Sequence, residues 1–464
     1  MARATGVTPQ WAEHFEPRPL TPDADSRVRL EQVIDLALEN NRGLRADLET
    51  IGQAKADLVQ AGLLPNPVLS LMVRFPEAGG RASFDFGLMQ ELADLWLIPS
   101  RKQAAQAMLR QKLLSFTDGA IALVADVKSR YHQLQYQDRA LELQQQNLEI
   151  LRQALEVAQI RLKAGESTLL DVNLLRSRYQ ETELMLVEAR SDFQMTQRML
   201  LRFMGVARAP DDWRPEPLPD APPAALSGDE ETYIDAALEQ RLDAKAAWWE
   251  VQSAAAELRQ EKLKFIQGLG VGVGGERTEQ QAQPGRNILA DTVRESLAAG
   301  RLMVPEIEPR SMRRAERRAM LDFMIGPSLS VTLPVFDQNQ AQVAKARYRA
   351  LELRQRYEAV EQEVIEGVRT AFTERRLAEA RTQFYRGSLL PIQESNLQLA
   401  QAAYQAGKEP VLTVLLAQEE LIRTRLAFAK AVGDLAISTV KLERQLAGRI
   451  PDVMTEPAPP SATE

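Results

Sequence analysis

The sequence predicts a mainly helical protein, built from long helical hairpins, that also carries a few strands of the kind found in membranes. Three observations predict this fold. Apolar residues recur every seven positions in long helical stretches, the same rows recur about 240 positions later, and short segments alternate large apolar residues with small or polar ones. Seven-residue rows form the seam between packed helices, whereas alternation with period two is typical of strands.

The first hairpin turns at 163–172. Its row before the turn is Leu134, Leu141, Leu148, Leu155 and Leu162, and its row after the turn is Val172, Tyr179, Leu186, Phe193 and Leu200. Between 101 and 164 the chain has no proline and a single glycine, Gly119. A continuous helix over this stretch would be about 95 Å long at a rise of 1.5 Å per residue. We therefore expect a long helix, a turn at Gly165 and a shorter helix to about 203.

The second hairpin repeats the first. Its rows consist of Leu390, Leu397 and Tyr404 before the turn and Leu421, Phe428, Leu435 and Leu442 after it, and both turns contain Ala-Gly. The segment Glu31–Glu39 also reappears, as Glu231–Glu239. One duplication explains both matches. It predicts helices over about 30–62 and 229–264, a long helix over about 338–407, and a shorter one over 411–446.

The duplication divides the chain into two structural repeats. The predicted parts are an irregular N-terminal arm at 1–29, a first repeat at 30–205 (helix, β-hairpin, long helix, turn, helix), a proline-rich linker at 206–228, a second repeat at 229–447, and a disordered tail at 448–464. An arginine-rich inserted loop at 276–323 makes the second repeat longer than the first. Its form does not follow from the sequence.

Four segments have strand periodicity. Their apolar positions are Leu69, Leu71, Val73 and Phe75; Phe84, Phe86 and Leu88; Phe265, Leu269, Val271 and Val273; and Leu329, Val331, Leu333 and Val335. Most of the residues that alternate with them are glycine, serine, threonine or charged, with Met72 as an exception. A tilted strand of about ten residues crosses a bilayer. Four strands cannot close a barrel, and each unpaired backbone group in lipid costs several kcal/mol.

Several copies must therefore pool their strands. Two copies would supply eight strands, a barrel filled by its own side chains, and three would supply twelve, enough for a passage. The predicted fold is mainly α with a membrane β-barrel: long helical hairpins form a helical barrel, and four strands per chain complete a 12-stranded barrel in a trimer.

Composition excludes several classes of function. The chain has 464 residues, a net charge of −7, no cysteine and two histidines. Thiolate chemistry is therefore excluded and imidazole chemistry nearly so, and the acidic balance argues against nucleic acid. Gly270–Gly275 matches a dinucleotide fingerprint by spacing, but that motif needs a helix opening at it, and here glycine alternates with valine as in a strand. We predict no enzyme activity, no cofactor and no metal site.

The duplicated hairpins, the Ala-Gly turns at 164–165 and 406–407, and the strand Gly326–Phe336 leading into a helix together resemble the TolC family of outer-membrane channels. The resemblance covers about residues 30–447. It implies the outer-membrane component of a tripartite efflux system: a passive trimeric exit duct in the cell outer membrane that extends through the periplasm. It also implies two partners besides outer-membrane lipid, a periplasmic adaptor (membrane fusion protein) and an inner-membrane pump.

The resemblance also implies functional residues at the helical tips. The adaptor-contacting tips would be Gly165, Leu169, Leu170, Gly407, Val411 and Leu412. Glycine suits a helix end that needs positive φ, and exposed leucine or valine could seat against a partner helix. The alternative is that these residues only close the hairpins. Glu166 and Asp171 are candidates for a constriction at the tip, although Thr413 stands at the matching position of Asp171.

Two alternatives remain at this stage. One is a soluble coiled-coil scaffold, because the first residues lack the apolar core of a secretory signal peptide. Against it, alternating strands of this kind have no place in the cytosol, so we expect that a signal segment is missing from the sequence. The other keeps the fold but serves metal-cation efflux or type I protein secretion.

Overall fold

The computed structural model describes residues 16–75, 77, 82–165, 167–210, 212–219, 225–264, 267–279, 288–305, 309–311 and 321–448. The chain divides into two compact units. Unit 1 comprises Met1–Lys55, Ala107–Val251 and Glu352–Glu464, and unit 2 comprises Ala56–Gln106 and Gln252–Leu351. The division passes within four helices, so each unit is described separately.

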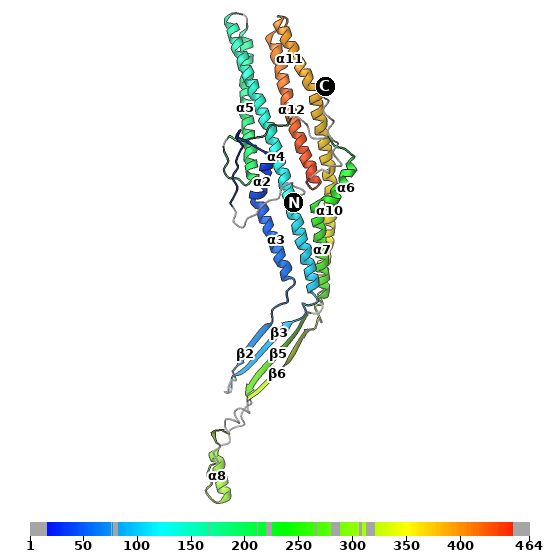
Figure 1. Ribbon diagram of the computed structural model, residues 1–464. Helices are drawn as coiled ribbons and strands as arrows, with labels where there is room; N and C mark the ends of the chain where they lie inside the picture. The colour runs from blue at the N-terminus through cyan, green and yellow to red at the C-terminus, as the bar shows by residue number, and fades with distance from the viewer. Residues whose placement is uncertain are drawn as a thin grey trace. The chain divides into compact units, whose positions relative to one another are not determined.

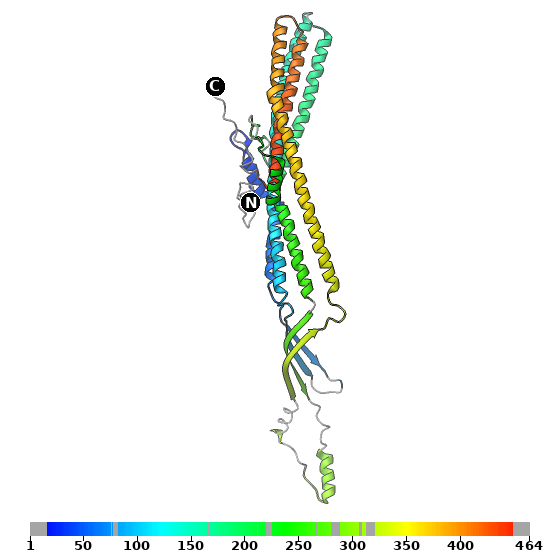
Figure 2. The same ribbon diagram turned by 90° about the vertical axis from the view of Figure 1, so that its right-hand side faces the viewer.

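Two hairpins of long helices make up most of unit 1 (Figure 1). The first consists of α4 (Ile98–Lys163) and α5 (Leu169–Phe203), and the second of α10 (Gln340–Phe384), α11 (Leu390–Gln405) and α12 (Val411–Gln445). Both views place the turn after α4 beside the turn after α11 (Figures 1 and 2). The long helices predicted from the seven-residue rows are therefore present.

Each repeat begins with two helices where the sequence predicted one. The first repeat has α2 (Leu30–Asn40) and α3 (Arg42–Gln60), and the second has α6 (Glu230–Gln240) and α7 (Leu242–Leu263). The breaks fall at Asn41, with φ −63° and ψ 115°, and at Arg241, with φ −58° and ψ 130°. The continuous helices expected over 30–62 and 229–264 were wrong because apolar periodicity runs across both breaks.

Tertiary hydrogen bonds hold the first break open. The Asn41 side-chain amide donates to the Phe203 carbonyl at 3.3 Å, and the Leu44 N–H donates to Asn41 Oδ1 at 3.0 Å. Asn41 thus satisfies a donor at the start of α3 and ties that helix to the end of α5. A bond to a residue so distant in the sequence leaves no trace in local periodicity.

The second long helix also differs from the prediction. Between α10 and α11 lies η1, a π-helical segment covering Tyr385–Leu389. Pro391 follows it at the start of α11. Proline has no N–H and clashes with the carbonyl four residues earlier, so an ordinary α-helical turn is unfavourable there. The helix predicted over about 338–407 therefore continues through a widened turn.

The core of the first repeat is built around α4. Tyr131, Leu134 and Leu200 are almost wholly buried, and they belong to the same hydrophobic cluster as Val33 and other residues of α2. The Tyr131 hydroxyl donates to the Val28 carbonyl at 2.7 Å and accepts from the Glu216 N–H at 3.0 Å. These bonds hold the short parallel pair β1 (Arg27–Val28) and β4 (Arg214–Pro215) against α4.

The core of the second repeat is smaller and includes a buried charge. Tyr233, Val368, Phe372 and Leu442 form its centre. Arg375 on α10 is fully buried and pairs with Glu379 at 2.9 Å. Burial lowers the pKa of the Arg375 guanidinium, and Glu379 opposes that shift.

Unit 2 contains the sheet. Its strands are β2 (Val68–Arg74), β3 (Ser83–Glu91), β5 (Gln267–Glu279) and β6 (Leu321–Thr332), ordered β2-β3-β5-β6 and antiparallel throughout (Figure 1). β5 and β6 therefore extend into the segment expected as an inserted loop, and that segment also contains helix α8 (Ile288–Ala299). Leu333 and Val335, expected in the last strand, lie beyond its end, and Phe265 lies outside the described residues.

Candidate functional site

One face of the sheet is apolar and open. The cross-strand partners Leu71–Phe86, Leu69–Leu88 and Val271–Leu329 all lie on this face. Its exposed members are Leu69, Leu71, Val73, Phe84, Leu88, Val271, Val273, Phe323, Ile325, Leu329 and Val331. Phe86 stacks on Phe323 with ring centroids 6.0 Å apart. A continuous apolar surface of this kind is typical of contact with lipid or protein rather than water.

The opposite face is small and polar. Pairing places glycines of β5 beside serines of β6, as in Gly272–Ser328 and Gly270–Ser330. Two rows across the four strands also carry larger side chains: Met72, Asp85, Glu276 and Met324 lie in register, and Val68 and Met89 lie in the row of Gly272 and Ser328. Asp85 forms an ion pair with Arg74 at 2.5 Å. The strand interpretation of Gly270–Gly275 is confirmed, since β5 runs through it and no helix opens there.

Both helical turns depend on a left-handed glycine. Gly165 has φ 78° and Gly407 has φ 70°, and a Cβ at either position would meet nothing within 4 Å. Glycine is needed for the backbone conformation rather than for space, because other residues rarely adopt positive φ. The N–H group of each glycine bonds back to the preceding helix. The Gly165 N–H donates to the Leu162 carbonyl at 3.1 Å, and the Gly407 N–H donates to the Tyr404 carbonyl at 2.9 Å.

The apolar residues expected at the tips differ in exposure. Leu169 is 63 % exposed, Leu170 67 % and Leu412 46 %, whereas Val411 is half-buried. Leucine side chains with this exposure at the start of a helix form a small apolar surface with no cover from the residues that the structure describes. Glu166, a candidate for the constriction, lies outside the described residues.

Asp171, the other candidate for the constriction, forms part of a helix cap. The Thr168 hydroxyl donates to Asp171 Oδ2 at 2.7 Å, the Thr168 N–H donates to the same oxygen at 3.0 Å, and the Asp171 N–H donates to Thr168 Oγ1 at 3.2 Å. This reciprocal arrangement is a capping box at the start of α5. The hydrogen bonds from Thr168 lower the pKa of the Asp171 carboxyl. This role was not predicted from the sequence, although Thr168 and Asp171 have the spacing of a capping box.

The two tips also contact one another within unit 1. Leu415 of α12 packs against the cluster of Ala158, Val172 and Leu175 in the first hairpin. Arg161 lies over the Tyr404 ring at 5.5 Å from its centroid, and Arg178 pairs with Glu419 at 3.6 Å. The predicted adaptor-contacting residues of both hairpins therefore lie at neighbouring tips.

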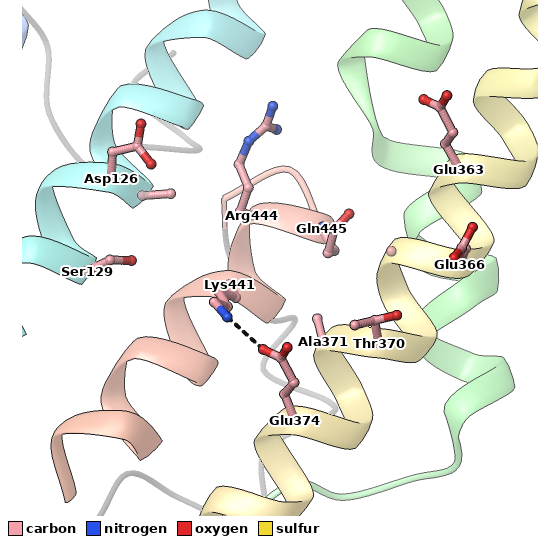
Figure 3. A pocket seen from close by; sticks show the side chains of 12 residues that line it. Asp126, Ser129, Glu363, Glu366, Thr370, Ala371, Glu374, Lys441, Arg444 and Gln445 are labelled. Atoms are coloured by element: carbon pink, nitrogen blue, oxygen red, sulfur yellow. Dashed lines mark hydrogen bonds and ion pairs between the residues drawn. The ribbon is translucent and has the colours of Figure 1, made fainter. Parts of the chain in front are cut away.

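A polar groove of about 450 Å³ lies between α4, α10 and α12 (Figure 3). Asp126, Glu363, Glu366 and Glu374 contribute acidic side chains, and Lys441 pairs with Glu374 at 2.7 Å. Nearby, Arg444 donates to both oxygens of Asp118, each at 2.8 Å. The Arg444–Asp118 pair joins α12 of the second repeat to α4 of the first, whereas the Lys441–Glu374 pair joins two helices of the second repeat. Within the described parts of the chain, no group of three or more histidine, cysteine, aspartate or glutamate side chains has the arrangement of a metal site.

None of the helices in the described ranges has the length and apolar composition to cross a membrane. The helical hairpins and the sheet define a class of protein: each chain has two pairs of long helices and a small antiparallel sheet, and one face of the sheet is apolar and exposed. The outer membrane efflux protein family model matches residues 33–206 and 233–448, and the chain belongs to this family. The chain is an outer-membrane channel component for efflux, and its family is one of channels rather than of enzymes.

Comparison with individual proteins agrees with this assignment. The chain is 23 % identical over 429 residues to the cobalt-zinc-cadmium resistance protein CzcC of Cupriavidus metallidurans, covering 91 % of each protein. Its fold matches a membrane protein from Pseudomonas aeruginosa at TM-score 0.66 and 22 % identity, covering 92 % of this chain and 90 % of the other. It also matches the outer-membrane channel OprN at TM-score 0.68 and 18 % identity, covering 96 % and 95 %. The predicted TolC-type fold and outer-membrane location are confirmed.

Proposed function

We propose that three copies of this chain form a passive exit duct, with a 12-stranded barrel in the outer membrane and a helical tube in the periplasm. A periplasmic adaptor and an inner-membrane pump complete the tripartite efflux system. The pump supplies the energy. The duct itself supplies a continuous water-filled path.

The observation that carries this proposal is the open sheet. Among the described residues, β2 and β6 each have a partner on one side only, and the sheet has one apolar face. Unpaired backbone groups and open edges are not tolerated in lipid, so β2 of one copy must meet β6 of another. Three copies of a four-stranded sheet make twelve strands, with Gly272, Ser328 and their neighbours facing the lumen.

Purification in detergent and recording in planar bilayers test this assembly. We expect a trimer that resists dissociation in cold dodecyl sulfate and dissociates on heating, and channels of one conductance class in the bilayer. A single-chain species that stays monodisperse without detergent would contradict the duct. The same fractions test the location, since the protein should sediment with outer membranes.

The adaptor contact is proposed to lie at the neighbouring tips, which comprise Gly165, Leu169, Leu170, Gly407, Val411 and Leu412. The exposure of Leu169 and Leu170 supports this contact, as does the packing of Leu415 against the first hairpin. An apolar helix tip of this size fits the groove or tip of a partner helical hairpin. Glu166 and Asp171 remain candidates for a constriction, with Asp171 also needed for the cap.

Substitution at the tip tests the adaptor contact. The double variant Leu169→Ser/Leu170→Ser should form normal trimers but lose chemical cross-linking to the adaptor and lose efflux. Leu184→Ser is a matched control, because Leu184 is 61 % exposed on the same helix but lies away from the tip. If the double variant cross-links and exports as well as the control, the tip is not the adaptor contact.

Metal cations are an alternative to apolar drugs as the cargo of the duct. The match to CzcC, which is named for cobalt, zinc and cadmium resistance, favours them over other cargoes of the same fold. Deleting the gene and measuring growth inhibition by these three ions, and in parallel by apolar drugs, separates the two cargoes. Sensitivity to the ions alone would assign the duct to a metal pump.

A further inference from the structure

Helix α8, in the segment between β5 and β6, has an apolar stripe that nothing in the described chain covers. Leu289, Val293 and Leu297 recur every four residues and are 71 %, 56 % and 77 % exposed. Residues spaced four apart lie on one face of a helix. Asp291 and Glu295 occupy the opposite face, Arg294 lies at the edge of the stripe, and no residue of α8 is buried.

The segment after α8 extends this apolar surface. The Arg301 N–H donates to the Ser296 carbonyl at 3.3 Å, and the Met303 N–H donates to Ser296 Oγ at 3.0 Å, so the chain folds back on the end of the helix. Leu302 and Val304 in this segment are almost fully exposed. Exposed apolar residues therefore continue past the last turn of α8.

The covalent chain limits where α8 can lie. Nine residue steps separate Glu279, the last residue of β5, from Ile288, and a fully extended chain of this length spans at most about 32 Å. The first residue of α8 must therefore lie within this distance of the end of a strand whose apolar face meets lipid in the proposed duct. With 12 residues the helix is about 18 Å long, too short to cross a hydrocarbon core of about 30 Å.

We propose that α8 lies in the surface of the outer membrane beside the mouth of the duct, with Leu289, Val293 and Leu297 in the acyl chains and Arg294 and Arg301 at the headgroup level. This inference rests on the proposed function, because the strands hold the helix at the membrane. A short helix with a high contrast between faces binds at the boundary of headgroups and acyl chains. Arginine at its edge can bind the phosphates of that boundary.

A second copy of the chain is the competing occupant, but the stripe is small for that purpose. A stable protein interface buries on the order of 1,000 Å² or more. Three aliphatic side chains on one short helix fall well below this area. Insertion into lipid has no such threshold, because each buried side chain adds to the binding of a segment already held at the membrane.

Single-cysteine labelling tests the proposal in the full chain, which has no cysteine of its own. Val293→Cys places an environment-sensitive fluorophore on the stripe, and Ala298→Cys places it on the opposite, exposed face of α8. The trimers are reconstituted into vesicles of phosphatidylethanolamine, phosphatidylglycerol and lipopolysaccharide. We expect the Val293 label to emit at shorter wavelength and to be quenched by iodide several-fold less than the Ala298 label.

Two outcomes overturn the proposal. If iodide quenches both labels equally, α8 lies in water. If oxidation of unlabelled Val293→Cys links two copies, the stripe joins copies over the mouth instead of binding lipid. A third label at Leu329→Cys, on the apolar sheet face, separates these failures from failure of the duct. When Leu329 is shielded and Val293 is not, only the inference about α8 fails, and when neither is shielded, the membrane sheet itself is contradicted.

Discussion

The two helical hairpins have buried residues at matching positions, but the spacing between these positions in their long helices differs by one residue. Val127, Tyr131 and Leu134 of α4 correspond to Val368, Phe372 and Arg375 of α10, 241 positions later, and all six are buried. Beyond η1 the correspondence is 242 positions, as between Leu148 and Leu390 or Leu200 and Leu442. The second long helix therefore holds one more residue than the first.

The π-helical segment is where this extra residue is accommodated. A π-turn bonds each residue to the fifth along rather than the fourth, so it takes up one residue without turning the helix on either side out of register. The duplication was thus modified by a local widening at Tyr385–Leu389, and the buried rows on both sides kept their partners. The two repeats therefore share the register of their buried rows at the core and at the tip, although the helix between these rows is regular in only one of them.

The largest expected effect is from deleting one residue. Removing Gln145 from the regular helix α4 should rotate everything after it by about 100° and take Leu155 and Leu162 off their seam. We expect the loss of folded trimer, a destabilisation beyond about 4 kcal/mol. Removing Gly387 from η1, together with Pro391→Glu (the residue type of the matching Glu149), should instead leave the trimer intact. Circular dichroism melting and trimer yield measure both.

The second prediction compares the stability of variants at Leu134 and Arg375, which occupy matching buried positions of α4 and α10. Leu134→Ala should cost about 2–5 kcal/mol, because it leaves a cavity in the first core. Arg375→Leu should cost clearly less, since leucine already fills the matching site and a desolvated charge is removed. Glu379, which would lose its partner, is only partly buried. Denaturant unfolding in detergent compares the two, and an equal loss for Arg375→Leu would show that the charge is required by the second core.

The third comparison uses two mid-helix glycines. A Cβ at Gly433 of α12 would lie 2.5 Å from the Tyr136 ring, whereas one at Gly119 of α4 would meet nothing within 4 Å. Gly433→Ala should therefore destabilise the protein by about 1–3 kcal/mol through overpacking. Gly119→Ala should stabilise it by about 0.5–1 kcal/mol through helix propensity. Thermal melting of the two variants checks this, and the same sign for both would contradict the close approach of α12 to α4.

The smallest effect is at the two tips. α5 begins with the box of Thr168 and Asp171, whereas α12 begins at Pro410 with no side-chain cap. Thr168→Ala should destabilise the first tip by about 1 kcal/mol, and Pro410→Asp should stabilise the second by a similar or smaller amount. Hydrogen exchange of the first-turn amides measures each tip. An exchange rate unchanged by Thr168→Ala would contradict the cap.

The effect of Thr168→Ala should also depend on pH. The folded-state pKa of Asp171 is lowered, so its carboxylate stabilises the cap above the ordinary value of 3.8, and this contribution is lost as the pH falls through the folded-state pKa. The difference between wild type and variant should therefore shrink below pH 3.8. A difference that stays constant into strong acid would exclude Asp171 from the cap.

The long helices, their duplication, the glycine turns and the alternating strands can all be predicted from the amino-acid sequence. These features follow from local rules: seven-residue rows, period-two alternation and the positive φ that Gly165 and Gly407 supply. The place of Leu169 and Leu170 next to a turn follows from the same rules, whereas their proposed contact with an adaptor came from the family resemblance.

Other features of the fold depend on contacts that form only in the tertiary structure. The break at Asn41 depends on a hydrogen bond to Phe203, and the burial of Arg375 depends on a core formed by four helices. The π-helical segment η1 depends on keeping two separated buried rows in register. The pairing of β3 with β5 joins segments from different repeats, and α8 interrupts a segment without clear periodicity. Each of these depends on contacts between residues far apart in the chain, which local periodicity does not encode.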